Sequence, residues 1–303
     1  MEPTSTISED VLTAFGIEHG MPLKALLGGS VTCYLAGEDI VFRPSEDDPE
    51  SEQVAQVVMK LALVMPPDAP YRISRPISVA TDPTRFVYNG WTAWAFVSGG
   101  HRDEMHWDEV LRTCRAFHED IGKIDIEKPE FLNRRMNRFR EADLVAWDEK
   151  SLNQLPVVAN ADVLSRIREP LRRLEALKGG FKNHRPRQLI HGDIGGNMLF
   201  EKNGQPPGII DLTFYWRPAG FGEAILVADG LMWHGEGDGL ITRYGTDADS
   251  IQLLVRALLF RTVAWAIDLE VAGHDSDKAW VEKMLPLIDF DGPVETVCKF
   301  VES

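Results

Sequence analysis

The chain has few cysteines and no excess of positive charge. Its 303 residues include three cysteines, Cys33, Cys114 and Cys298, which lie far apart and lack metal-ligand spacing, so neither a disulfide framework nor a zinc site is expected. Acidic residues outnumber basic ones by 47 to 32, and the net charge is −15. We therefore expect no nucleic-acid partner, because such a protein needs a basic face.

Long uncharged apolar runs are also missing. The most apolar window, residues 251–273, is interrupted by charged residues such as Arg256 and Arg261, which indicates a buried amphipathic helix instead of a membrane span. Residues 1–5 show no basic region leading into an apolar core, so no signal peptide is expected. These features predict a cytoplasmic protein with no membrane partner.

Residues 1–97 have the pattern of a small antiparallel sheet. Apolar runs at residues 23–27, 31–35 and 40–43 are separated by turns that contain glycine. The first turn contains Gly28, Gly29 and Ser30, whose backbone N–H groups can cover the phosphates of a nucleotide. A hairpin without any ligand has the same pattern, so this turn alone does not decide between the two.

Two charged residues of this part can contribute to such a site. Arg43 ends the third strand, where a cation can reach phosphate oxygens, although an exposed charge on an edge strand is the alternative. A helix is expected to begin near Asp47, and it carries Glu52. Glu52 either faces solvent or turns inward to pair with Arg43.

Residues 91–97 predict a further strand, which ends at Ser98-Gly99-Gly100. This glycine pair is the expected boundary between an N-terminal lobe, residues 1–97, and a C-terminal lobe, residues 98–303. Beyond it, helical spacing predominates. Helices are predicted at residues 106–121, 131–147, 161–177, 223–233, 251–270 and 277–288, and a two-stranded hairpin at residues 198–200 and 208–210. The expected fold class is therefore α+β.

The chemistry is concentrated where two short apolar runs end. Asp193 follows Leu189-Ile190-His191-Gly192, Asn197 comes four residues later, and Asp211 closes the run Ile209-Ile210. One carboxylate can take the proton of an acceptor hydroxyl, and a second carboxylate with an amide oxygen suits Mg²⁺. A single aspartate would more simply cap a turn, but the three together indicate phosphoryl transfer.

The pattern His191-Gly192-Asp193-x-x-x-Asn197, followed by Ile209-Ile210-Asp211, resembles the aminoglycoside phosphotransferase and choline kinase group. These are protein-kinase-like enzymes that act on small molecules. The resemblance implies a two-lobe fold with a small antiparallel-sheet N-lobe and a larger, mainly helical C-lobe. It also implies that Asp193 is the catalytic base and that Asn197 and Asp211 bind Mg²⁺. His191 is expected to pack in the loop with a ring nitrogen bonded to the backbone.

The resemblance extends over most of the chain and implies a nucleotide site. Gly28, Gly29 and Ser30 correspond to the phosphate-covering turn, and Arg43 stands where the kinase lysine would be, with Glu52 as its partner. Ala95 and Val97 correspond to the hinge that offers backbone groups to a purine. A narrower resemblance, to an actinobacterial subfamily without an assigned substrate, rests on Arg75-Pro76, Gly90-Trp91-Thr92-Ala93-Trp94 and Tyr215-Trp216-Arg217-Pro218.

Two departures from the family pattern stand out. Gly195-Gly196 replaces the His-Pro pair common in the catalytic loop, and a loop with two glycines is more flexible. Thr213 follows Leu212 where a protein kinase has glycine. Neither change removes an oxygen ligand.

The leading hypothesis is a kinase that transfers the γ-phosphate of ATP or GTP to a hydroxyl of a small molecule. A nucleotide-binding pseudokinase that regulates a partner is the alternative, and nucleotidyl transfer on the same fold is a third reading. Acids and large aromatics after Asp211 would suit an amine-bearing acceptor, whereas helix caps and core packing are the simpler roles for each of them. These residues are Glu223, Asp229, Glu236, Asp238, Trp216 and Trp233.

Overall fold

The computed structural model describes residues 7–26, 31–102, 104–155, 161–267 and 282–301. The chain forms two compact units, each assembled from separate stretches. The first unit comprises Met1–Met105, Glu119–Phe131 and Gly196–Phe214, and the second comprises His106–His118, Leu132–Gly195 and Tyr215–Ser303. The lobe boundary predicted at residue 97 stays a prediction, and each unit is described on its own below.

The first unit contains the predicted antiparallel sheet, with strand order β1-β2-β3-β7-β5 and β6 paired to β7. Its strands are β1 (Leu23–Leu26), β2 (Cys33–Ala36), β3 (Ile40–Pro44), β5 (Pro76–Ile77), β6 (Val87–Tyr88) and β7 (Trp91–Ala95). The antiparallel strands expected between residues 23 and 43 are confirmed, and in β2 the alternate residues Tyr34 and Ala36 are buried.

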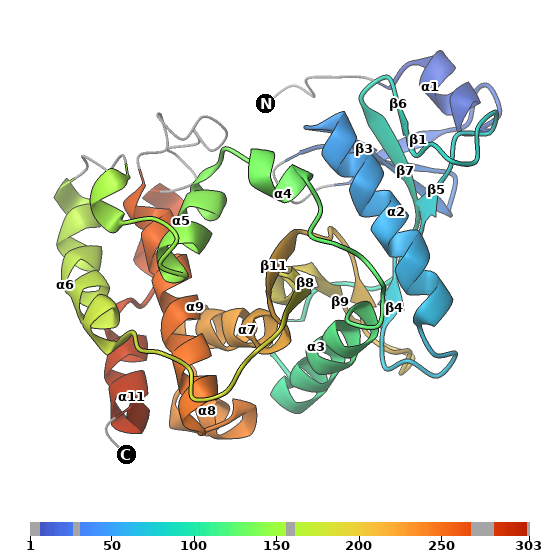
Figure 1. Ribbon diagram of the computed structural model, residues 1–303. Helices are drawn as coiled ribbons and strands as arrows, with labels where there is room; N and C mark the ends of the chain where they lie inside the picture. The colour runs from blue at the N-terminus through green and yellow to red at the C-terminus, as the bar shows by residue number, and fades with distance from the viewer. Residues whose placement is uncertain (1–6, 27–30, 103, 156–160, 268–281, 302–303) are drawn as a thin grey trace. The chain divides into compact units, whose positions relative to one another are not determined.

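Aromatic residues fill the core beside this sheet. Phe42 of β3 is fully buried and meets Phe15 edge-on, with ring centroids 5.6 Å apart, just after helix α1 (Glu9–Ala14). Helix α2 (Asp48–Val64) lies along the sheet and contacts β5 and β6 (Figure 1). Its start is confirmed, since the side chain of Asp47 accepts a hydrogen bond from the backbone N–H of Glu50 at 2.7 Å.

A second, three-stranded sheet of the first unit has the order β4-β10-β9. The predicted hairpin forms β9 (Met198–Leu199) and β10 (Gly208–Ile209), and β4 (Arg72–Ile73) pairs with β10 as a parallel strand. Arg72 donates from Nε to the carbonyl of Pro206 at 2.8 Å and from Nη2 to that of Ser98 at 3.0 Å. The hairpin is thereby joined to the segment that follows β7.

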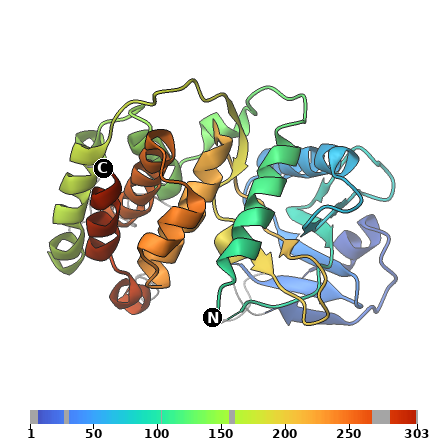
Figure 2. The same cartoon turned by 90° about the horizontal axis from the view of Figure 1, so that it is seen from below.

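The second unit is mainly helical. The remaining helices are α3 (Trp107–Ile121), α4 (Phe131–Arg134), α5 (Arg138–Ala146), α6 (Ala161–Leu177), α7 (Ala219–Trp233), α8 (Asp238–Tyr244), α9 (Ala248–Ala266) and α11 (Asp291–Val301), and strands β8 (Arg187–His191) and β11 (Phe214–Pro218) pair with each other. Helix α9 packs against α5, α6, α7 and α11, and α6, α9 and α11 lie side by side (Figures 1 and 2). This central place explains why α9 is apolar on nearly every side.

The single helix predicted for residues 131–147 is wrong. The chain forms α4 and α5 there, with Asn137 between them in an extended conformation (φ −134°, ψ 166°). The side chain of Asn137 accepts a hydrogen bond from the backbone N–H of Arg140 at 2.8 Å and so begins a new helix. Strand β11 and helices α8 and α11 were not predicted, and the helix predicted at residues 277–288 lies mostly outside the described residues.

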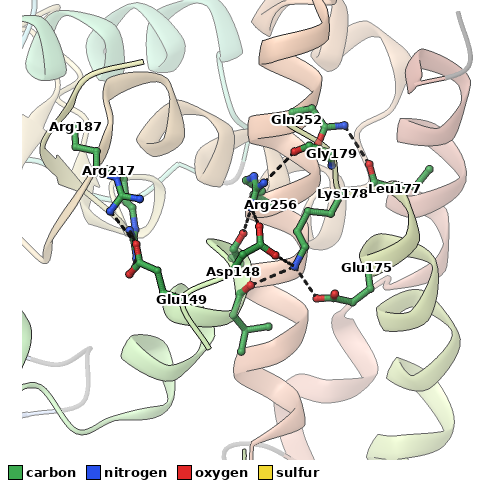
Figure 3. A network of polar contacts seen from close by, with 12 residues as sticks. Asp148, Glu149, Glu175, Leu177, Lys178, Gly179, Arg187, Arg217, Gln252 and Arg256 are labelled. Atoms are coloured by element: carbon green, nitrogen blue, oxygen red, sulfur yellow. Dashed lines mark hydrogen bonds and ion pairs between the residues drawn. The ribbon is translucent and has the colours of Figure 1, made fainter. Parts of the chain in front are cut away.

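A network of charged side chains joins the helices of the second unit (Figure 3). Asp148 contacts Lys178 Nζ with Oδ1 at 2.7 Å and Arg256 Nη1 with Oδ2 at 2.9 Å. Arg256 also donates from Nη2 to the carbonyl of Gly179 at 3.0 Å. The loop after α5 is thus tied to α9 and to the end of α6.

Arg217 of β11 is the most buried cation of this network among the residues that Figure 3 labels. Its Nε and Nη2 donate to the two carboxylate oxygens of Asp143 at 2.8 and 2.7 Å, and its Nη1 donates to Glu149 at 2.6 Å. The side chains of Arg217 and Asp143 are only 4% and 5% exposed. Burial alone would lower the pKa of Arg217, but the two carboxylates outweigh it and raise the pKa.

Within the described part of the chain, no helix combines the length and the apolar character that a membrane span requires.

Arg217→Met should destabilise the protein strongly, because it leaves the Asp143 carboxylate buried without its bidentate partner. Losing one member of a buried ion pair costs about 3–5 kcal/mol of unfolding free energy. Arg172→Met is the matched control: Arg172 bonds Glu169 in an exposed pair, where a loss of about 0–1 kcal/mol is expected. Thermal and urea unfolding of both variants would measure the difference. Equal stability of the two variants would contradict the structural role of Arg217.

Candidate active site

The first unit brings Asn197 and Asp211 next to each other. In the β9–β10 hairpin, Ile209 pairs with Met198, and the backbone N–H of Ile210 donates to the carbonyl of Asn197 at 3.0 Å. Asn197 and Asp211 therefore flank the same end of the hairpin. A short loop and two two-residue strands are enough to bring these two residues to one end of the hairpin, as expected for residues at the ends of adjacent strands.

Arg43 forms an ion pair with Asp211, from Nη1 to Oδ1. Burial alone would lower the pKa of Arg43, but the Asp211 carboxylate outweighs it and raises the pKa. The backbone of Asp211 has φ 49°, in the left-handed region that few residues other than glycine, asparagine and aspartate adopt. Such strained conformations cluster at functional sites, where the surrounding structure holds them in place.

The acid that contacts Arg43 is not the expected one. The carboxylate of Glu52 accepts hydrogen bonds from the backbone N–H groups of Phe86, at 2.9 Å, and Val87, at 3.1 Å. These bonds connect α2 to the start of β6, while Arg43 forms its ion pair with Asp211. The expected pairing of Glu52 with Arg43 is therefore corrected: Glu52 bonds backbone N–H groups, and Arg43 pairs with Asp211. The sequence of α2 did not indicate these backbone partners of Glu52.

The expected hinge residues differ in their contacts. The N–H of Ala95 donates to the carbonyl of Arg75 at 2.7 Å, and its own carbonyl accepts the hydroxyl of Ser74 at 2.7 Å. The side chain of Val97 packs so closely on Gly208 that a Cβ at position 208 would lie 2.2 Å from Val97 Cγ1. Recognition of a purine by Ala95 would compete with these bonds, and both hinge assignments stay predictions. Gly28, Gly29 and Ser30 lie outside the described residues.

Asp193 belongs to the second unit, where it follows β8. The backbone N–H of Asp193 donates to Nδ1 of His191 at 3.3 Å, which confirms that this buried histidine bonds the backbone of its loop. His118 supports the strand from α3. Its Nδ1–H donates to the carbonyl of Cys114 at 2.8 Å, and its Nε2 accepts the backbone N–H of His191 at 3.0 Å. Both ring nitrogens of His118 are therefore used in a neutral tautomer.

Gly192 is required by close packing at the same loop. A Cβ at this position would lie 2.3 Å from Cε2 of Tyr215, so no larger residue fits without moving the ring. Tyr215 is fully surrounded, and burial raises its pKa; Arg135, Asp143, Arg261 and Asp193 are the charged groups that act on its hydroxyl. Tyr215 thus lies among the charges that surround Asp193.

Arg261, which the sequence did not assign to the site, contacts Asp193 and is itself bound to Asp229. Arg261 of α9 donates from Nη2 to Asp193 Oδ1 at 2.9 Å, and Asp229 of α7 accepts from the same guanidinium. In the sequence, Arg261 only interrupts an apolar helix and Asp229 is one acid among several. One feature of the sequence could have indicated the role of Arg261: an arginine on an otherwise apolar, buried helix requires an oppositely charged partner.

The donor set of the first unit suits a hard divalent cation. Asn197 and Asp211 offer an amide oxygen and carboxylate oxygens, and Mg²⁺ is typically held by one or two carboxylates together with substrate phosphates. Within the described ranges no cluster of three or more His, Cys, Asp or Glu side chains forms a metal site. Asn197 and Asp211 are therefore the described residues that could hold Mg²⁺.

The model of the phosphotransferase enzyme family matches residues 30–216 of the chain, a range that includes Asp193, Asn197 and Asp211. No match was found among curated proteins.

Solved structures show the same fold at low sequence identity. An aminoglycoside phosphotransferase from Alicyclobacillus acidocaldarius has 15% identity and a TM-score of 0.56, with 99% of this chain and 97% of that chain covered. The ADP-bound aminoglycoside phosphotransferase APH(2'')-Ib has 15% identity and a TM-score of 0.53, with coverage of 97% and 99%. A microcompartment-associated aminopropanol kinase has 16% identity and a TM-score of 0.55, with coverage of 97% and 96%. These likenesses confirm the kinase-like α+β fold.

His118→Gln should remove part of the acid sensitivity of the protein. Burial, with a smaller contribution from His191, lowers the pKa of His118 from 6.5 to about 3. The unfolded chain therefore binds a proton between pH 6.5 and 3 that the folded chain does not, and unfolding free energy falls as pH decreases, by up to about 1.4 kcal/mol per pH unit from this group. Glutamine offers an oxygen to the His191 N–H but does not titrate. Urea unfolding from pH 7 to 4 should give a shallower slope for the variant, and parallel slopes would contradict this assignment.

Proposed function

Since the chain belongs to the phosphotransferase enzyme family, we propose that it transfers the γ-phosphoryl group of ATP or GTP to a hydroxyl of a small molecule. The observation that carries this proposal is that Asn197, four residues after Asp193, and Asp211 flank the same end of the β9–β10 hairpin. The ADP in one structural neighbour supports nucleotide binding by this fold.

Asp193 is proposed as the catalytic base. The acceptor oxygen forms a bond to the γ-phosphorus, the bond from that phosphorus to the bridging oxygen breaks, and the nucleoside diphosphate leaves. The hydroxyl proton passes to the carboxylate of Asp193, whose side chain is 49% exposed and thus accessible to a ligand. His191 is fully buried, so it supports the loop and is not offered as the base.

Asn197 and Asp211 are proposed to hold Mg²⁺, which supplies charge neutralisation at the phosphate oxygens when bound. Arg43 is proposed to bind the phosphates. Its planar fork would exchange the Asp211 carboxylate for phosphate oxygens, while Asp211 turns to the metal. Gly28, Gly29, Ser30, Ala95 and Val97 complete the proposed nucleotide site, and Glu52 contributes by fixing α2.

The contacts of the four acids between residues 223 and 238 bear on whether the acceptor carries an amine. An amine-bearing acceptor is supported by the names of two neighbours, which act on aminoglycosides and aminopropanol. However, each acid that suggested amine binding has an internal partner. Glu223 pairs with Arg115, Asp229 with Arg261, Asp238 with Lys299, and Glu236 accepts a hydrogen bond from Trp107. Recognition of an amine would need groups other than these four carboxylates.

Nucleotide binding should depend on Mg²⁺ and on Asp211. With ligand at about 100 times its Kd, binding stabilises a protein by about 2.7 kcal/mol, which corresponds to a rise of roughly 5–10 °C in Tm. MgATP and MgGTP should each be compared with the same nucleotide plus EDTA. Asp211→Asn should lose the Mg²⁺-dependent part of the shift, and asparagine tolerates the φ of 49°. Asp82→Asn, at an exposed turn, is the control. No shift with any nucleotide would sink the kinase proposal.

Phosphoryl transfer should depend on Asp193. Incubation of MgATP with a panel of hydroxyl compounds, followed by mass spectrometry, separates added phosphoryl groups from added nucleotidyl groups. Asp193→Asn should lower turnover about 100-fold or more, as loss of a general base does, with the nucleotide thermal shift retained. A wild-type protein that binds MgATP while the Asp193→Asn variant behaves identically in every assay would favour the pseudokinase alternative.

A further inference from the structure

Arg261 connects Asp193 to a second carboxylate in the second unit. Its Nη2 donates to Asp193 Oδ1 at 2.9 Å and to Asp229 Oδ2 at 2.6 Å, while its Nε donates to Asp229 Oδ1 at 2.7 Å. Arg261 thus forms a bidentate pair with Asp229, and its Nη2 also bonds Asp193. The side chains of Arg261 and Asp229 are 12% and 16% exposed, against 49% for Asp193.

Charge and burial make Arg261 a fixed cation. Burial opposes its charge, but the carboxylates of Asp229 and Asp193 outweigh this and raise the pKa of Arg261. Burial also raises the pKa of Asp229, and the guanidinium opposes that change. A bidentate arginine–carboxylate pair fixes the plane of the guanidinium as well as its position. Arg261 therefore offers Asp193 a donor with a set direction.

The catalytic loop itself has little intrinsic stiffness. Gly195 and Gly196 follow Asp193, and glycine leaves the backbone unrestricted. Gly195 lies directly on α7: a Cβ there would be 2.9 Å from Leu226 Cδ1 and 3.8 Å from Asp229 Oδ2. The same part of α7 thus supports the loop backbone and holds Arg261, so the order of the loop comes from its contacts with the helices.

We propose that Arg261, held by Asp229, is the positioning residue of Asp193, and that it replaces the stiffness that Gly195-Gly196 does not provide. The inference rests on the proposed function, because it assigns Arg261 a role through the base. The guanidinium fixes one carboxylate oxygen and leaves the half-exposed side chain accessible to a hydroxyl or to water. Misplacing a catalytic group by about 1 Å can cost about 100-fold in rate.

The test uses release of inorganic phosphate from MgATP, with water as the acceptor. Arg261→Met should lower kcat about 10- to 100-fold and leave the KM for MgATP within about twofold, because the nucleotide residues lie elsewhere. Arg261→Lys should recover part of the loss, as it keeps the charge but not the fork. Guanidinium ions added to Arg261→Ala should also restore turnover.

Asp229→Asn tests the support of Arg261. It should lower kcat with KM unchanged, and the double variant with Arg261→Met should be no slower than Arg261→Met alone, because both changes remove one arrangement. Arg172→Met, which removes an exposed arginine of the same unit, should have wild-type kcat. Circular dichroism melting of each variant excludes unfolding as the cause.

A second measurement does not require turnover. In protein labelled with ¹³C-aspartate, the carboxyl signal of Asp193 is identified from its loss in Asp193→Asn. This signal should move in Arg261→Met and in Asp229→Asn but stay in place in Arg172→Met. An unmoved signal, or full kcat in a folded Arg261→Met, overturns the inference. Turnover that is insensitive to Asp193→Asn, with the signal shifts present, counts against the proposed function and leaves the arrangement of Arg261 standing.

Discussion

Arginine side chains buried among helices set the geometry of the second unit. Each guanidinium loses water on burial and is stable only where carboxylates and carbonyls replace that water in the right directions. Arg217 meets Asp143 and Glu149, Arg256 meets Asp148 and the Gly179 carbonyl, and Arg261 meets Asp229 and Asp193. Since the fork of an arginine accepts partners in few orientations, these contacts specify how strand, loop and helix pack.

Each unit contains one ion pair between an arginine and a candidate site aspartate. In the first unit, Arg43 forms an ion pair with Asp211, the proposed metal ligand. In the second unit, Arg261 forms an ion pair with Asp193, the proposed base. Both aspartates are therefore electrostatically satisfied within their own unit.

The sequence was most informative where structure is local. Strands β1 to β3, the cap of α2 by Asp47 and the hairpin that carries Asn197 and Asp211 depend on residues close in the chain, and all were anticipated. The partner of Glu52 and the role of Arg261 were not. Glu52 bonds residues 34 and 35 positions away, and Arg261 bonds a residue 68 positions away, so their partners are set by tertiary packing. The helix break at Asn137 was missed because apolar spacing continues across it, although asparagine is a strong cap.

The backbone of Asp211 restricts which residues can replace it. With φ at 49°, alanine, valine and most other side chains would add strain, whereas glycine and asparagine would not. Both of these neutral replacements are one base change from an aspartate codon. A lineage with no use for the carboxylate would thus have two substitutions open to it that keep this backbone conformation, although both would remove the ion pair with Arg43. The positive φ of residue 211 therefore does not by itself require a carboxylate, because a neutral glycine or asparagine would adopt it equally well.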